Sequence, residues 1–385
     1  MLFIVGCLYW LKLQPYSIPE HLLPSAFPVG QTLWELVLTF LDAPLLLFPI
    51  VALFLPEIRR CSRRSTVLAG ILFLGYLVLA IYPSHLRGDF PLEPMSGAIG
   101  EWVNPQAIFG WLLLKERAPV VLGTGVRVVL TAVSFGGWFG MMCSLLHHSL
   151  WTDAGDASSD FSRVLGLRGV SWRQLGVLLV PFSVAYGLLL LPRSATSGLR
   201  DRYLLGLLPV ALLCMIRYYQ ERIHLRMPQM GVLLVGAMAI YSACVVHDMF
   251  SLYRARVELA AELRSDGVSD SSVDNGWEYN FGAELHYADH INERKIAVPA
   301  NAYLPRAPQP AGMCAMNQYD KTPHIFPLYG VSFDPDACYG MAPFAPVHYS
   351  RWLGRKQGTL YAVYYFPPSE RVAAYGGTSR PATKR

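Results

Sequence analysis

Apolar and polar residues follow one another in long blocks along this chain. Predominantly apolar runs cover residues 1–11, 33–55, 66–82, 128–146, 175–191, 203–216 and 230–246. A helix of about 20 apolar residues is long enough to cross the hydrocarbon core of a bilayer. The blocks therefore predict a mainly α-helical, polytopic membrane protein with about seven transmembrane helices, of which the run at 1–11 is short for a full span.

Basic residues between these runs set the expected orientation. Clusters of arginine follow the runs at 33–55, 128–146 and 203–216. In membrane proteins, the loops that are rich in arginine and lysine usually face the cytoplasm. The pattern predicts that the N-terminus lies inside and that the region after residue 250 lies outside the membrane. The ten arginines concerned are Arg59, Arg60, Arg63, Arg64, Arg163, Arg168, Arg173, Arg217, Arg222 and Arg226.

Composition agrees with two regions of different character. Of the 385 residues, 53% are hydrophobic and 15% are charged, whereas soluble domains carry about 25% charged residues. Residues 251–375 have an ordinary soluble composition, so we expect a transmembrane region at 1–250, a small extracytoplasmic α/β domain at 251–375 and a disordered basic tail at 376–385. The net charge of +5 is spread over membrane-flanking clusters and indicates topology, not nucleic-acid binding.

The outer domain opens with a helix at 251–265. Leu252, Ala255, Leu259 and Leu263 lie at helical spacing among charged residues, and Gly267 is suited to end the helix. Apolar and aromatic runs predict strands at 274–281, 330–333 and 359–366, with a short helix at 283–290. This order fits a small α/β domain.

Three arginines break the orientation rule, because Arg193, Arg200 and Arg202 lie on the predicted outer hairpin. In one interpretation Asp201 and lipid headgroups satisfy their charge. In the other they bind an anionic ligand such as a lipid phosphate, which a planar guanidinium can hold through two oxygens. Tyr203 suits the same interface because its ring is apolar and its hydroxyl is polar.

One acidic residue falls inside a predicted span. Asp42 lies in the run at 33–55, and an ionisable group at membrane depth is a functional candidate. The competing interpretation, which we favour, is that the helix starts at Asp42 and uses it as an N-cap near the interface.

Two pairs of ligand-type residues also have simpler interpretations. His247 and Asp248 close the last span, where an interfacial anchor is favoured over a metal site. Asp334 and Asp336 match a D-x-D metal-binding pattern but also a turn after a strand, and the turn is favoured. Neither pair is therefore predicted to bind a metal ion.

Cysteine usage points to one bridge. Of the seven cysteines, Cys314 and Cys338 share the predicted outer domain, where disulfides are permitted. A disulfide between them is expected, and two free thiols are the alternative.

The stretch DRYLLGLLP at 201–209 resembles the RYLLPLLP-type motif of GT-C membrane glycosyltransferases, the superfamily of protein mannosyltransferases and lipid A aminoarabinose transferases. Gly206 departs from that motif, which usually has proline there. The stretches FLDAPLLLFPIVALFLP at 40–56 and RARVELAAELRSDGVSDSSVDNGWEYN at 254–280 are similar to bacterial members. The likeness covers most of the chain but is diffuse outside 201–209.

This resemblance implies transfer of a sugar from a polyprenyl-phosphate donor at the outer face of the bacterial inner membrane. Arginines at the outer helix ends, here Arg202, Arg200 and Arg193 beside Tyr203, would hold the lipid phosphate. An acidic residue in the first outer loop would act as the base. That loop offers Glu20 and His21 without the family's acidic motif.

The expectation is therefore a chain that corresponds to the C-terminal part of such an enzyme, with a partner polypeptide supplying the part that carries the base. A divalent metal is compatible with the resemblance, although no cofactor is identified. The alternative is a non-enzymatic membrane scaffold or a transporter-like protein. An internal repeat, which is common in transporters, is not visible in the sequence.

Overall fold

The computed structural model divides the chain into two compact units. The C-terminal unit comprises Met1–Glu20, Ile108–Val121 and Ser242–Arg385, and the helical unit comprises His21–Ala107 and Leu122–Tyr241. The residues described are 43–86, 114–116, 120–150, 171–196, 201–224, 226–287, 308–317, 319, 322–354, 357–370 and six isolated positions near the N-terminus, without the side chains of 80–86, 124, 192–196, 201, 202 and 287. The predicted tail at 376–385 and the short run at 1–11, apart from Gly6 and Tyr9, lie outside them.

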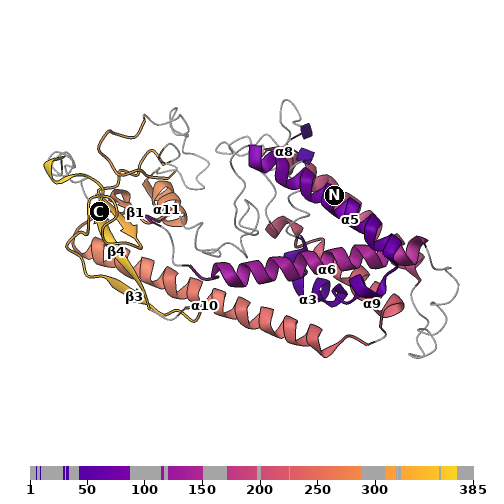
Figure 1. Ribbon diagram of the computed structural model, residues 1–385. Coiled ribbons are helices and arrows are strands. Elements are labelled where there is room, and N and C mark those ends of the chain that lie inside the picture. The colour runs from indigo at the N-terminus through magenta and orange to yellow at the C-terminus, as the bar shows by residue number, and fades with distance from the viewer. Residues whose placement is uncertain are drawn as a thin grey trace. The chain divides into compact units, whose positions relative to one another are not determined.

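The helical unit consists of long apolar helices and two interrupted segments (Figure 1). Within the described part of the chain, three helices are long and apolar enough to cross a membrane, namely Gly125–Leu150, Trp172–Leu191 and Gln229–Ser265. A membrane protein is thus supported, with fewer candidate spans than the seven predicted. The elements are α3 (Phe48–Val51), η1 (Ala52–Phe54), α4 (Glu57–Arg60), α5 (Arg63–Leu86), α6 (Thr124–Leu150), α8 (Trp172–Thr196), η3 (Asp201–Leu204), α9 (Leu208–Arg222) and α10 (Gln229–Ser265).

The run at 33–55 does not form one continuous helix in its described part. Helical turns from residue 43 lead through α3 and η1 to α4, because prolines at 44, 49 and 56 lack the N–H that a continuous helix requires. Val51 and Phe54 are completely buried, and they pack with Met215 and Tyr219 of α9. Irregular backbone at membrane depth is tolerated where protein surrounds it, and this segment meets that condition.

Three glycines of α6 allow this interrupted segment to approach closely. A Cβ at Gly137 or Gly140 would overlap the carbonyl oxygen of Val51 or Phe54, and a Cβ at Gly136 would lie 2.8 Å from a methyl of Leu55. Small residues four positions apart are a common means of packing helices in membranes. The GGWFG sequence at 136–140 therefore brings the two backbones into contact.

The motif at 201–209 is also interrupted. It forms the short turn η3, and the regular helix α9 begins only at Leu208. The Tyr186 hydroxyl of α8 donates to the Tyr203 carbonyl at 2.9 Å, and a Cβ at Gly206 would lie 2.6 Å from the Tyr186 ring. Glycine at position 206 therefore leaves room for the Tyr186 ring.

The C-terminal unit contains a four-stranded sheet of order β1-β2-β4-β3 beside the second half of α10 (Figure 1). β1 pairs parallel with β2, whereas β4 pairs antiparallel with β2 and β3. The predicted helix spacing is confirmed, since Leu252, Leu259 and Leu263 are buried. The elements are η4 (Asp270–Ser272), β1 (Val273–Asp274), α11 (Trp277–Tyr287), β2 (Tyr329–Ser332), β3 (Val347–Tyr349) and β4 (Gly358–Tyr364).

Most of the predicted boundaries in this unit hold, but one strand is wrong. The strands predicted at 330–333 and 359–366 correspond to β2 and β4, and Gly267 ends α10 with a positive φ of 82°. Only the first residue of the predicted strand at 274–281 is extended. Gly276, at φ 81°, turns the chain so that α11 begins at Trp277, earlier than the helix predicted at 283–290.

The close approach at Gly137 generates a stability prediction. Gly137→Ala should lower the free energy of unfolding by about 1–3 kcal/mol, because the new methyl overlaps rigid backbone. Thermal unfolding of the purified protein in detergent measures this change. Gly75→Ala in α5 is the control, since no atom lies within 4 Å of its Cβ position. Equal stability of the two variants would contradict the packing described.

Candidate functional site

The structure describes only part of the predicted lipid-phosphate site. Arg200 lies outside the described residues, as do the side chains of Arg193 in α8 and Arg202 in η3. Tyr203 is half-buried, and its carbonyl is the group held by Tyr186. Asp42, Glu20 and His21 also lie outside the described residues. What the structure adds is the backbone of the motif, a short turn fixed against α8.

An apolar groove lies in the helical unit beside the interrupted segment. Its volume is about 240 Å³, and its surface is almost wholly hydrocarbon. Ligand pockets usually combine an apolar surface with a few polar groups that fix the orientation of the ligand. A groove of this composition suits a hydrocarbon chain and not a polar substrate. It is lined by Leu45, Phe48, Leu122, Val126, Leu130, Leu234, Ala237, Met238 and Tyr241.

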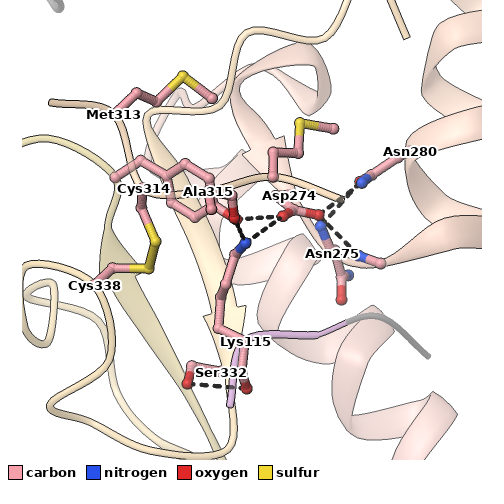
Figure 2. A network of polar contacts seen from close by, with 12 residues as sticks. Lys115, Asp274, Asn275, Asn280, Met313, Cys314, Ala315, Ser332 and Cys338 are labelled. Atoms are coloured by element: carbon pink, nitrogen blue, oxygen red, sulfur yellow. Dashed lines mark hydrogen bonds and ion pairs between the residues drawn. A yellow bond between two sulfur atoms is a disulfide. The ribbon is translucent and has the colours of Figure 1, made fainter. Parts of the chain in front are cut away.

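A buried polar network, here called the Lys115 clamp, lies in the C-terminal unit (Figure 2). Residues 114–116 come from the segment between α5 and α6 and pair with the end of β2: the Lys115 N–H donates to Val331 at 3.2 Å, and the Phe333 N–H donates to the Lys115 carbonyl at 3.2 Å. β1 pairs with the start of β2 along one edge, and β4 pairs with β2 along the opposite edge. Lys115 pairs with the end of β2 on the same edge as β1, and it therefore lies next to Asp274, the last residue of β1.

The side chains of the clamp are withdrawn from water. Lys115 is 9% exposed and Asp274 is 2% exposed. The Lys115 amine lies 3.6 Å from the Asp274 carboxylate, donates to the Ala315 carbonyl and lies over the Tyr365 ring. Burial lowers the pKa of the Lys115 amine, and attraction to Asp274 opposes that change.

The Asp274 carboxylate accepts several further hydrogen bonds. Its Oδ1 accepts from the Gly276 N–H at 3.2 Å and from Asn280 Nδ2 at 2.6 Å, and its Oδ2 accepts from the Tyr365 hydroxyl. Burial, and then the neighbouring carboxylate, raise the pKa of Tyr365 well above its usual value. Asp274 thus joins the turn before α11, the strand region at Tyr365 and the Lys115 segment.

A third charged side chain, that of Arg256, extends the network into α10. Arg256 is 3% exposed, and its guanidinium donates to the Asn275 side chain at 3.2 Å and to the Asn275 carbonyl. Arg256 also pairs with Glu278 at 3.4 Å. Because these polar groups are engaged with one another, the arrangement fixes the unit internally.

Two cysteines of this unit, Cys314 and Cys338, form a disulfide with a Cα–Cα separation of 5.5 Å, whereas Cys244 of α10 is free. The Cys314 N–H donates to the Tyr365 carbonyl at 2.8 Å. The bridge therefore holds the chain next to Ala315, whose carbonyl receives the Lys115 amine (Figure 2).

The ligand-type pairs have structural roles. Asp248 is buried and accepts two backbone N–H bonds, from Trp352 and Leu353. Asp334 accepts from the Asp336 N–H at 2.9 Å, which is the expected turn. Among the described residues, no group of three or more His, Cys, Asp or Glu side chains could hold a metal ion.

Comparison with known proteins adds no relative: no protein-family model, curated protein or solved structure matches the chain. The resemblance to GT-C enzymes therefore depends on the motif residues themselves, and any function drawn from it is a proposal.

Sequence reasoning missed the Lys115 clamp. Lys115 falls in the stretch 84–127, a predicted external loop between the apolar runs at 66–82 and 128–146, and its partners Asp274 and Ala315 lie far away along the chain. No local signal marks such a contact.

Removing the lysine should destabilise the C-terminal unit. In Lys115→Met the free energy of unfolding should fall by about 2–3 kcal/mol, because the Asp274 charge stays buried without its cation. Thermal unfolding in detergent, followed by tryptophan fluorescence, measures the loss.

Two variants control this experiment. Arg264→Met removes an exposed pair with Asp270 and should cost less than about 1 kcal/mol. The double variant Lys115→Met, Asp274→Asn should recover much of the loss, since no unpaired charge is left. A Lys115→Met effect no larger than that of Arg264→Met would show that the clamp contributes little.

Proposed function

We propose that this is a bacterial inner-membrane protein that binds a polyprenyl-phosphate-linked sugar at the outer face, in the manner of a GT-C glycosyltransferase. The observation that carries the proposal is the apolar groove formed by α6, α10 and the interrupted segment. The RYLL-type motif, which includes η3, is a separate feature of the same helical unit. Sugar transfer would further require a general base, for which the structure supplies no candidate in its described part.

The composition of the groove supports a lipid ligand. An isoprenoid chain has no hydrogen-bonding groups, so it would leave none of its own polar groups unsatisfied against Leu130, Leu234 and Met238. A volume of about 240 Å³ is below the roughly 300–1,000 Å³ of sites that enclose a whole small molecule. We therefore expect the groove to hold part of the chain while the head group lies elsewhere.

The motif supports a head-group site. Tyr186 and Gly206 hold η3 against α8, so the backbone that carries Arg202 is fixed by neighbouring helices. A guanidinium presented from a fixed backbone can form two parallel bonds to a phosphate, which a lysine cannot.

The Lys115 clamp limits the number of crossings in the proposed topology. Because residues 114–116 pair with β2, they lie on the same side of the membrane as the C-terminal unit. The chain must then cross the membrane an even number of times between Lys115 and that unit. The candidate spans α6, α8 and α10 provide only three crossings. The segment from Asp201 to Arg222 is the available fourth crossing, with η3 and the residues after it adding length to the 15-residue helix α9.

A transporter-like function is the second candidate. Transporters often place paired discontinuous helices at their substrate site. The helical unit contains two interrupted segments that pack together, since Phe54 of η1 meets Tyr219 of α9 with ring centroids 5.5 Å apart. Uptake of a solute into proteoliposomes would favour this candidate, and binding of a lipid phosphate without uptake would favour the first.

Filling the groove should weaken lipid binding. In Ala237→Phe the affinity of the purified protein for a polyprenyl-phosphate analogue should fall about tenfold or more, which is a loss of about 1.4 kcal/mol, since the new ring would occupy groove volume that the lipid chain needs. Arg202→Lys tests the head group in the same titration and should lose about 1–3 kcal/mol if the arginine holds two phosphate oxygens.

The control is Ala239→Phe, the same change two residues further along α10 at an exposed position outside the groove lining. It should bind like the wild type, and unfolding temperatures verify that the variants are folded. Equal affinities for Ala237→Phe and Ala239→Phe would contradict the groove, and unchanged affinity in Arg202→Lys would contradict the phosphate clamp.

The four-crossing topology can be tested by labelling single cysteines in a background that keeps only Cys314 and Cys338. Val120→Cys and Ser197→Cys should react with a membrane-impermeant maleimide in intact cells, whereas Ser149→Cys should react only after permeabilisation. Ser197→Cys is decisive, because two crossings by α6 and α10 alone would leave position 197 inside. Protection of that position in intact cells would overturn the topology.

A further inference from the structure

The surface of α10 changes character at His247. Between Met230 and Val246 the helix carries no charged residue, and large apolar side chains such as Val232, Leu233 and Ile240 are exposed. These 17 residues span about 25 Å at 1.5 Å per residue, close to the thickness of a bilayer core. The first ionisable side chains after them are His247 and Asp248, so the boundary of the hydrocarbon falls there.

A loop of the C-terminal unit is fastened to the helix at this level. The Asp248 carboxylate, 1% exposed, accepts the Trp352 N–H at 2.6 Å and the Leu353 N–H at 3.0 Å. One turn further along α10, the Ser251 hydroxyl accepts the Ser350 N–H at 3.0 Å. Residues 350–353, here called the interfacial loop, are thus held by three hydrogen bonds from their backbone to α10.

The loop presents a tryptophan that the protein leaves uncovered. The Trp352 ring stacks on His247 with centroids 3.9 Å apart and planes 8° apart, yet Trp352 is 63% exposed. Phe250, on the next turn of α10, is 56% exposed. Tryptophan is enriched at the level of lipid headgroups because its ring is apolar and its N–H is polar.

We infer that the interfacial loop is a lipid-binding element, which lays Trp352 into the headgroup layer of the membrane that α10 crosses. The occupant is a lipid surface because the exposed ring stacks on His247, which lies two helical turns beyond the exposed Ile240 on the same face of α10, at the level where charged residues begin. This contact goes beyond the proposed sugar-lipid site, and it would fix the C-terminal unit at the membrane surface through a second element besides α10.

Quenching by brominated lipid tests the contact. The full-length protein is reconstituted into phosphatidylcholine vesicles, with and without bromine on the acyl chains near the headgroups. The chain has nine tryptophans, so the contribution of one is the difference between wild type and a phenylalanine variant. The Trp352 contribution, from Trp352→Phe, should lose most of its intensity in brominated vesicles.

Two matched measurements complete the design. Trp277 is exposed on α11, next to Glu278, which pairs with Arg256. Arg256 lies about 12 Å beyond Asp248 along the helix, so the Trp277→Phe difference should be unquenched. Leu233→Trp adds a ring at a 65% exposed position of the apolar segment, and its added emission should be quenched.

An unquenched Trp352 contribution beside a quenched Leu233→Trp signal would overturn the inference, leaving Trp352 as a ring that only stacks on His247. If the Leu233→Trp signal is also unquenched, α10 does not cross the bilayer and the inference fails with it. Trp352→Tyr is a control for a change of fold, because it keeps an aromatic ring against His247. The difference in tryptophan emission between wild type and Trp352→Tyr should equal the difference between wild type and Trp352→Phe. Because lipid-phosphate binding is not measured, this result is independent of the proposed function.

Discussion

The ion pair between Lys115 and Asp274 is the contact on which the organisation of this chain depends. Taking an ammonium and a carboxylate out of water is expensive unless the two are paired and their remaining hydrogen-bonding groups are satisfied. Here Asn280, Tyr365 and the Gly276 N–H complete the shell of Asp274. The pair thereby joins a segment from between two apolar helices to a sheet formed by the last third of the chain.

This local contact constrains the whole topology. A polypeptide cannot pair with a strand across a bilayer, so the Lys115 segment and the C-terminal unit share one side of the membrane. If α6, α8 and α10 all cross the bilayer, the proposed topology needs a fourth crossing, and the run of 14 residues at 203–216 is the available one. The apolar pattern predicts this run as a span, but η3 and a turn shorten its regular helix to the 15 residues of α9.

A second constraint, the absence of hydrogen-bonding partners in hydrocarbon, explains the centre of the helical unit. The prolines between residues 43 and 56 break the helix, and the broken segment is wrapped by α6 and α9 so that its backbone faces protein. Gly137 and Gly140 permit this close wrapping. The apolar groove lies beside the same segment, since Leu45 and Phe48 belong to its lining.

The sequence by itself determined the elements whose cause is local. Uninterrupted apolar runs specified α5, α6, α8 and α10, the spacing of Leu252, Leu259 and Leu263 specified a buried helix face, and apolar and aromatic runs specified β2 and β4. The aromatic run after Gly276 has strand propensity, but a turn at that glycine directed it into α11.

Only the tertiary structure decided which distant residues meet. Lys115 and Ala315 are 200 positions apart, and Trp352 meets His247 only because Asp248 binds the backbone of its loop. Side-chain periodicity reports which face of an element is buried and is silent about its partner. For that reason the helices could be predicted from the chain, whereas the clamp, the groove and the interfacial loop required the fold.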